Sequence, residues 1–142
     1  MQENIDILRS LNYELVKNLG LFKRRANMAF SQRHILYHID NHPGLSIREL
    51  AALLYVDHST MSRNIKKMEQ DGWVEIYQDE TDKRRKIIAL SPEGSKLLTE
   101  ATESINQTIG QALNLLTKEE VEAIIENVRK YNHALEQRLK SK

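Results

Sequence analysis

The chain has 142 residues, of which 40% are hydrophobic and 29% are charged, which suits one compact domain with a core. No apolar run approaches the roughly 20 residues of a membrane span, and the first residues lack the pattern of a secretory signal, so we expect a cytoplasmic protein. Cysteine is absent, which excludes disulfides, thiolate metal sites and thiol-based redox sensing.

A leading helix is predicted over residues 5–25, because apolar residues recur there at helical spacing. Its apolar face is wide, which indicates that more than one neighbour covers it. Ser31 is then predicted to cap a second helix, with Phe30 and Ile35 packed across its first turn. That helix is expected to end before Pro43, since proline disfavours helix at the preceding residue.

The segment LSIREL carries the clearest local signal, a capping box in which Ser46 and Glu49 satisfy backbone N–H groups at a helix start. Asp57 is predicted to cap another helix, which ends near Gly72. Only three or four residues separate the two helices, so they are predicted to form a helix-turn-helix. The predicted buried positions of the second helix are Met61, Ile65 and Met68.

A hairpin, or wing, is predicted next from two segments rich in Val, Ile, Tyr and Trp, residues 73–78 and 86–90. A long helix is expected over residues 92–116, with proline at its first position. Thr117 and Glu120 form the capping box of a last helix. The apolar seams of the first and the last two helices are too long for the small winged helix to cover, which favours a homodimer.

The whole chain is therefore predicted to be one mainly α (α+β) domain of residues 1–142. Its winged helix-turn-helix core covers about residues 31–90. Dimerisation helices are expected at both ends, over about residues 5–25 and 91–140.

Positive charge is concentrated in two short places, although the net charge of the chain is only +1. Between residues 58 and 70, three cations oppose one acid, and between residues 82 and 86, four cations oppose one acid. Local clusters of this kind, rather than a high net charge, are what a DNA footprint requires.

The segment of residues 42–98 resembles the MarR (multiple antibiotic resistance regulator) family of bacterial winged-helix repressors. Asp82 and Arg84 occupy the family's D-x-R wing motif, Ile88 follows four residues later, and ALSPEG is similar to the family's entry into its first dimerisation helix. The resemblance implies a homodimeric repressor that binds a pseudo-palindromic operator in double-stranded DNA. It also implies release by a small aromatic or anionic effector.

The polar face of the second helix of the helix-turn-helix is predicted to read DNA, because the start of a recognition helix reaches base edges in the major groove. Arg63 can donate two hydrogen bonds to guanine, whereas Lys66 and Lys67 suit phosphates. An ordinary solvated face is the alternative, which the capped, tightly joined preceding helix makes less attractive. The candidate residues are Ser46, His58, Ser59, Thr60, Ser62, Arg63, Asn64, Lys66 and Lys67.

The wing adds Asp82, Arg84, Arg85 and Lys86 to the candidate DNA-binding residues. The resemblance implies that Arg84 enters the minor groove and that Asp82 braces it by an ion pair. A narrow A·T-rich minor groove attracts such a guanidinium, and Arg85 and Lys86 are expected to reach the flanking phosphates. Solubility charges on a hairpin tip are the alternative, but four successive cations repel one another.

Five residues are only loosely indicated as binding an effector, and packing in a core or an interface is the simpler interpretation of each. They are Tyr13, Phe22, Arg25, Tyr37 and His38.

A metal-responsive regulator is a second hypothesis, since His34, His38 and His42 recur every four residues. No neighbouring residues complete a recognised ligand set, so no metal site and no cofactor are expected. A winged-helix adaptor that binds proteins instead of DNA is a third hypothesis. No nucleophile elbow, P-loop, HExxH or GxGxxG motif occurs, so we expect no enzyme activity.

Overall fold

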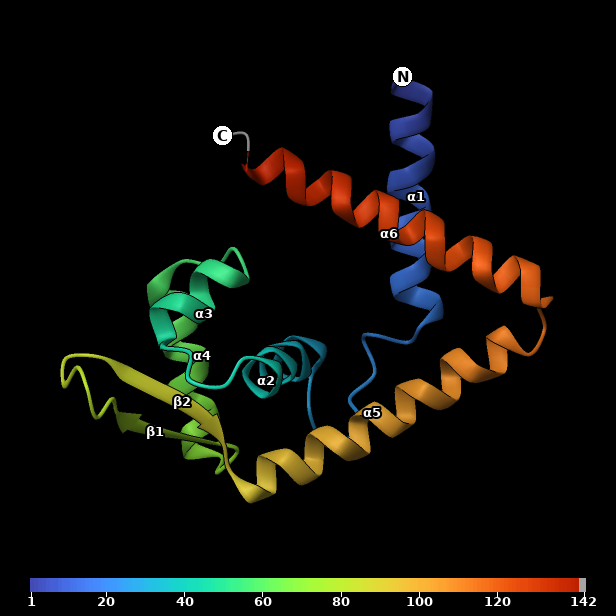
Figure 1. Ribbon diagram of the computed structural model, residues 1–142. Helices are drawn as coiled ribbons and strands as arrows, with labels where there is room; N and C mark the ends of the chain where they lie inside the picture. The colour runs from blue at the N-terminus through green and yellow to red at the C-terminus, as the bar shows by residue number, and fades with distance from the viewer. Residues whose placement is uncertain (141–142) are drawn as a thin grey trace. The chain divides into compact units, whose positions relative to one another are not determined.

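The computed structural model describes residues 1–140, and its elements follow the predicted order of helices around a wing (Figure 1). The predicted fold class, a mainly α winged helix-turn-helix with helices on both sides, is confirmed. No helix among residues 1–140 combines the length and hydropathy needed to cross a bilayer. The elements are α1 (Gln2–Asn18), α2 (Phe30–Asn41), α3 (Ile47–Leu53), α4 (His58–Gln70), β1 (Val74–Gln78), β2 (Lys86–Leu90), α5 (Pro92–Leu113) and α6 (Lys118–Lys140).

The described chain divides into two compact units at the middle of α5. The first unit spans residues 1–105 and contains α1 to β2 with most of α5, and the second begins at Asn106. The regular elements of the second unit are the end of α5 and the helix α6. The winged helix-turn-helix therefore lies entirely within the first unit.

The first helix is shorter than the sequence predicts, because α1 ends at Asn18 and not near residue 25. Gly20 has a φ of 68°, a left-handed conformation typical of residues that follow a helix. A tight turn comes next, in which the Arg25 N–H donates to the Met28 carbonyl at 3.0 Å and the Met28 N–H donates back at 2.9 Å. The predicted extension was wrong because apolar residues in this loop continue the helical spacing by chance.

Two buried arginines hold the segment between α1 and α2. Arg25 donates to the carbonyls of Leu19 at 3.1 Å and Gly20 at 2.8 Å, just after the end of α1. Arg33 donates to the carbonyl of Met28 at 3.0 Å. Burial and the nearby charge of Arg25 lower the pKa of the Arg33 guanidinium. The Leu19 carbonyl is one that the end of α1 leaves without a helical partner, whereas the carbonyls of Gly20 and Met28 also accept backbone N–H groups.

The start of α2 also differs from the prediction, since its N-cap is Ala29 and not Ser31. The Gln32 side-chain oxygen accepts a hydrogen bond from the Ala29 N–H at 2.8 Å. The expected packing pair is displaced with the cap, and Phe30 is exposed. The side chain of alanine cannot cap a helix, so the sequence pattern gave no indication of Ala29, and the prediction of Ser31 was wrong.

The helix-turn-helix has the predicted caps at both helix starts. In α3, the Ser46 hydroxyl accepts from the Glu49 N–H at 3.1 Å, and the Glu49 carboxylate accepts from the Ser46 N–H at 3.4 Å. In α4, the Asp57 carboxylate accepts from the Thr60 N–H at 2.8 Å. Tyr55, in the turn between the helices, has a φ of 56°, which an L residue adopts at a cost.

The core lies under the helix-turn-helix and wing. The inward positions predicted for α4 are buried, so that prediction is confirmed, and the polar face of α4 points away from the core. The buried residues of this cluster are Met28, Ile35, Leu36, Ile39, Leu50, Ala51, Met61, Ile65, Met68, Trp73, Val74, Ile88 and Leu98.

The wing is a two-stranded antiparallel sheet in which Val74 pairs with Leu90 and Gln78 with Lys86. The segment before α3 lies along β2, because the Ile88 N–H donates to the Leu45 carbonyl at 3.0 Å. This third segment was not predicted from the sequence. It joins the hairpin to the start of α3 through the backbone.

The first turn of α5 packs directly on the start of β1. The Ser91 hydroxyl donates to the Gly72 carbonyl at 2.5 Å and accepts from the Gly94 N–H at 3.0 Å. A Cβ added at Gly94 would lie 2.0 Å from the Trp73 carbonyl oxygen. Only glycine fits at this contact, since real Cβ atoms do not approach so closely.

The long helix α5 ends at Leu113, three residues before the predicted Leu116. The capping box that starts α6 is confirmed, since the Thr117 N–H donates to the Glu120 carboxylate at 2.9 Å and the Glu120 N–H donates to the Thr117 hydroxyl at 3.1 Å. The glutamate pKa is lowered by these bonds to Thr117. The new helix therefore begins with its own local signal.

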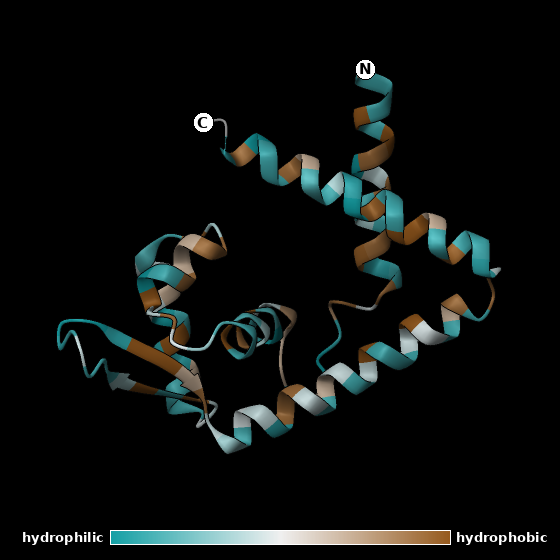
Figure 2. Cartoon of the chain, viewed as in Figure 1, coloured by the Kyte–Doolittle hydropathy of each residue, from teal (hydrophilic) through white to brown (hydrophobic). Residues whose placement is uncertain are grey.

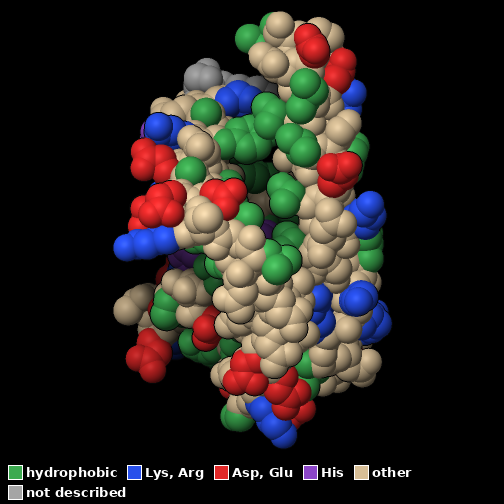
Figure 3. Space-filling model, turned by 90° about the vertical axis from the view of Figure 1, so that its right-hand side faces the viewer, with side chains coloured by type: hydrophobic (Ala, Val, Ile, Leu, Met, Phe, Trp, Pro, Cys, Tyr) green, Lys and Arg blue, Asp and Glu red, His purple; other side chains and the backbone are tan. Residues whose placement is uncertain are grey.

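The helices α1 and α6 contain no buried residue. Hydrophobic residues recur along both of them (Figure 2), and hydrophobic side chains reach the surface of the molecule (Figure 3). The large exposed apolar residues of these two helices are Ile5, Ile7, Leu8, Leu11, Tyr13, Leu15, Ile124, Ile125, Val128 and Leu135. Within one chain, these apolar side chains remain in contact with water.

Candidate nucleic-acid interface

The outward face of α4 brings together most of the residues that the sequence analysis selected. Met61, Ile65 and Met68 are buried on the inner side of the helix, which turns the intervening polar positions outward. Thr60 and Ser62 are half-buried at the edges of this face. The exposed members are His58, Ser59, Arg63, Asn64, Lys66 and Lys67.

Asp57 organises the start of this face. Its carboxylate accepts hydrogen bonds from the Thr60 hydroxyl at 2.6 Å, the Thr60 N–H at 2.8 Å and the Ser59 hydroxyl at 2.8 Å. These bonds lower the pKa of Asp57 to about 2. The Thr60 hydroxyl in turn accepts from Arg63 at 3.3 Å. The cap therefore orients three polar side chains as well as the helix.

A groove of about 690 Å³ lies between the start of α3, the start of α4 and the wing. Arg48, which was not among the predicted residues, is an exposed cation in the first turn of α3 and lines this groove. Its position two residues after the Ser46 cap was the signal that could have found it. The lining residues are Ser46, Ile47, Arg48, Glu49, His58, Ser62, Asp82, Arg84, Arg85 and Lys86.

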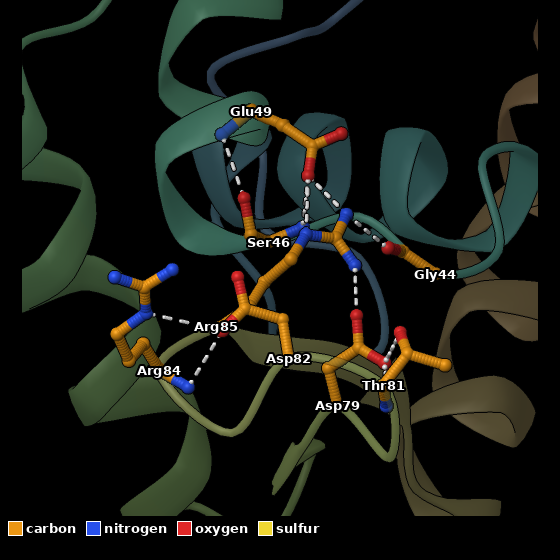
Figure 4. Close-up of polar contacts among 8 residues, drawn as sticks. All are labelled: Gly44, Ser46, Glu49, Asp79, Thr81, Asp82, Arg84 and Arg85. Carbon is orange, nitrogen blue, oxygen red and sulfur yellow. Dashed lines mark hydrogen bonds and ion pairs between the residues drawn. The ribbon is translucent and has the colours of Figure 1, made fainter.

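Arg84 extends from the wing beside this groove, with its side chain 93% exposed. The Asp82 carboxylate accepts from the Arg84 side-chain Nε at 3.3 Å and from the Arg84 backbone N–H at 3.1 Å (Figure 4). The ion pair expected between these two residues is thus present. The remaining guanidinium nitrogens of Arg84 point away from the carboxylate (Figure 4).

Arg85 differs from its neighbours, because it is folded back against the protein. It donates to Glu49, to Asp79 at 3.0 Å and to the Gly44 carbonyl at 2.9 Å (Figure 4). The bonds to Glu49 and Asp79 raise the pKa of Arg85, and that of Glu49 is lowered, chiefly by Arg85. A phosphate contact by Arg85 stays a prediction that this geometry does not favour. Lys86 is exposed.

Ser46 also differs from its expected role. Its side chain is buried, and its hydroxyl accepts the hydrogen bond that caps α3. Only its edge reaches the wall of the groove. A contact between Ser46 and DNA stays a prediction, whereas its hydroxyl caps α3 in the structure.

Comparison with known proteins assigns the chain to a family. Residues 26–85 match the model of the MarR family. The HTH-type transcriptional regulator BilQ of Clostridium symbiosum is 30% identical over 106 residues, which cover 75% of this chain and 74% of that protein. The chain belongs to the MarR family. It is therefore a transcriptional regulator.

Solved MarR-family structures share the fold over nearly the whole chain. The Staphylococcus aureus MepR–DNA complex is 25% identical, covers 90% of this chain and 95% of that chain, and superposes with a TM-score of 0.70. MarR from E. coli, in its apo form, is 20% identical, covers 89% of this chain and 94% of that chain, and gives a TM-score of 0.74. The expected fold is thus confirmed.

The candidate effector residues of this MarR-family chain do not form one cluster in the described contacts. Tyr13 and Phe22 leave 70% and 89% of their surfaces exposed. Arg25 is buried and bonded to the Ser104 hydroxyl at 3.1 Å. Tyr37 and His38 make a ring contact, with centroids 5.1 Å apart. An effector site at these positions stays a prediction.

His34 and His38 of α2 and His42, its C-cap, form a row of ring contacts, edge-on between the first two and stacked between the last two. Ring centroids are 4.7 Å apart for His34 and His38 and 5.7 Å apart for His38 and His42. Burial, followed by the neighbouring imidazoles, lowers the pKa of His38. Among residues 1–140, no group of three or more His, Cys, Asp or Glu side chains is placed to hold one metal ion.

Proposed function

We propose that this MarR-family regulator is a homodimer that binds a pseudo-palindromic operator in double-stranded DNA. It acts as a repressor, and a small aromatic or anionic effector releases it. The observation that carries the DNA-binding part is the shared groove between α3, α4 and the wing, with the exposed cations of α4 beside it. The MepR–DNA complex, 25% identical, supports the same reading.

The two basic elements, α4 and the wing, have separate tasks in this proposal. The helix α4 enters the major groove, where Arg63 reads guanine and Lys66 and Lys67 contact phosphates. Arg84 enters the adjacent minor groove, braced by Asp82 at 3.3 Å. Such a division needs the wing and the recognition helix at a fixed separation.

We regard residues 1–142 as one MarR-type domain, with a winged helix-turn-helix core of about residues 31–90. The terminal helices supply the dimer interface, which spans about residues 5–25 and 91–140. The absence of buried residues on α1 and α6 supports this role. A symmetric dimer would remove both apolar faces from water.

We expect a constitutive dimer, because the exposed apolar faces of α1 and α6 are too extensive for a stable monomer. Sedimentation should give twice the chain mass at micromolar concentration. Ile125→Glu, on the exposed apolar face of α6, should shift the equilibrium towards monomer, whereas Glu126→Gln on the same helix should not. A folded monomer of the parent chain would contradict the dimer.

The DNA-binding part is tested by selecting duplexes from a random pool with the purified protein and footprinting the winners. We expect a site with two-fold symmetry and half-site centres about 10 bp apart, or a multiple of this. Affinity should fall steeply with salt, because phosphate contacts release counterions. The proposal would be contradicted if the protein bound no DNA at any salt concentration, or if the footprint had no internal symmetry.

A further inference from the structure

Arg85 is held by three residues from two segments, the start of α3 and the hairpin turn. Its Nε donates to Glu49 at 3.0 Å, its Nη1 to Asp79 at 3.0 Å and its Nη2 to the carbonyl of Gly44 at 2.9 Å, with a further bond from Nη2 to Glu49 (Figure 4). Gly44 precedes α3, Glu49 lies in its first turn, and Asp79 begins the hairpin turn. One side chain thus connects the wing to the helix-turn-helix.

The guanidinium has little capacity left for a phosphate. A guanidinium has five N–H donors, and the four bonds to Glu49, Asp79 and Gly44 use all but one of them. The charge is also neutralised locally, because two carboxylates face one cation. Only 31% of the Arg85 side chain is exposed, compared with 93% for Arg84.

Both carboxylates also have hydrogen-bond partners other than Arg85. Glu49 accepts from the Ser46 N–H in the α3 capping box. Asp79 accepts from the Thr81 N–H at 3.0 Å and the Thr81 hydroxyl at 2.9 Å, and these bonds, followed by Arg85, lower its pKa. Because Arg85 is bonded to a carboxylate of α3 and to one of the hairpin turn, a movement of either element would move the other.

The hairpin tip depends on the same residue through its backbone. The Asp79 N–H donates to the Arg85 carbonyl at 2.9 Å, and the Arg85 N–H donates to the Asp82 carbonyl at 2.9 Å. Arg84, which the proposed function places in the minor groove, lies inside this turn. Fixing Arg85 therefore fixes where Arg84 stands relative to α3 and α4.

We propose that Arg85 is a positioning residue that does not contact DNA. Its bonds to Glu49, Asp79 and Gly44 tie the wing to the start of α3 and hold Arg84 at the separation from α4 that one duplex requires. The proposal rests on the proposed function where it concerns DNA, but the tie itself is a property of the free protein.

The first test uses the free protein and needs no DNA. Amide hydrogen exchange of the hairpin, residues 74–90, is compared between the parent chain and three variants. Arg85→Gln and Glu49→Gln should both speed exchange in the turn, by about fivefold or more for Arg85→Gln. Glu49→Gln keeps the α3 capping box, since glutamine also serves at that position. Lys83→Gln removes the same charge from the same turn without touching either carboxylate, and should leave exchange unchanged.

The second test measures affinity for the selected operator and its salt dependence. If Arg85 ties the wing, Glu49→Gln should weaken operator binding roughly threefold to tenfold, and adding it to Arg85→Gln should cost little more. If Arg85 contacts phosphate, Glu49→Gln should instead tighten binding, because it frees the guanidinium. Arg85→Gln should keep the parent salt slope, whereas Lys86→Gln should reduce it by about one.

The outcomes separate the two proposals. Unchanged exchange in Arg85→Gln, or a salt slope reduced by about one, would overturn the positioning role while operator binding by the parent chain stands. A parent chain that binds no DNA would overturn the proposed function, and the exchange experiment would still decide whether Arg85 ties the wing. Circular dichroism of each variant checks that a change is local to the hairpin.

Discussion

Replacement of Gly94 by alanine should destabilise the winged helix severely, by about 3 kcal/mol. The added Cβ would lie 2.0 Å from the Trp73 carbonyl oxygen, so the backbone of β1 or α5 must move. That carbonyl also accepts from the Ser91 N–H at 3.0 Å, and the movement would break this bond. The free energy of unfolding, measured by urea denaturation, reports the loss.

Gly110→Ala is the matched control, because Gly110 lies in the same helix with no atom within 4 Å of an added Cβ. Alanine favours a helix interior over glycine by about 1 kcal/mol, so this variant should be slightly more stable than the parent chain. An equal loss in Gly110→Ala would contradict this assignment, because helix propensity favours alanine at both positions and only the contact with Trp73 distinguishes Gly94.

Arg63→Ala and Arg84→Ala should both weaken operator binding, but they should change sequence preference differently. Arg63→Ala should cost about 1–3 kcal/mol on the operator and relax the preference at one position in each half-site. Arg84→Ala should cost a similar amount, yet it should distinguish only A·T-rich from G·C-rich flanks, since the minor groove offers a degenerate code and a width. Asp82→Ala should show a milder form of the Arg84 defect, because it removes the brace alone.

The measurement is a binding series on one operator, its flank-swapped versions and a random duplex. Lys66→Ala serves as the comparison variant, since a phosphate contact should weaken operator and random DNA alike. If Arg84→Ala bound every duplex as well as the parent chain, the wing would be a solvated charge cluster. If Arg63→Ala lost affinity for all sequences equally, Arg63 would contact phosphate and not a base.

Features that depend on near neighbours in the sequence were predicted well. The caps at Ser46, Asp57 and Thr117 are formed within three residues of each serine, aspartate or threonine, and the apolar spacing of α4 selected its buried side. The prediction of the α2 cap failed because Ala29 has no side chain that could cap a helix. The hydrogen bond at this helix start instead runs from the Ala29 N–H to the Gln32 side chain.

Features that depend on distant partners could not be predicted. The D-x-R motif led to Asp82 and Arg84, which are two residues apart and do form an ion pair. Arg85 stands next in the sequence, yet its main partner, Glu49, is 36 residues away. The sequence pattern predicted that both arginines contact DNA. In the structure, the Arg84 side chain is exposed, whereas the Arg85 side chain is bonded to other residues of the protein.

The Asp57 cap has a consequence for which bases the start of α4 can recognise. The Ser59 hydroxyl donates its only hydrogen to the Asp57 carboxylate at 2.8 Å, in a charge-assisted bond that is stronger than one between neutral groups. Its oxygen can then only accept. Phosphate oxygens and guanine's O6 and N7 offer no hydrogen to such a group, whereas the amino groups of adenine and cytosine do. In the proposed complex with DNA, Ser59 is thereby restricted to accepting a hydrogen bond from an amino group.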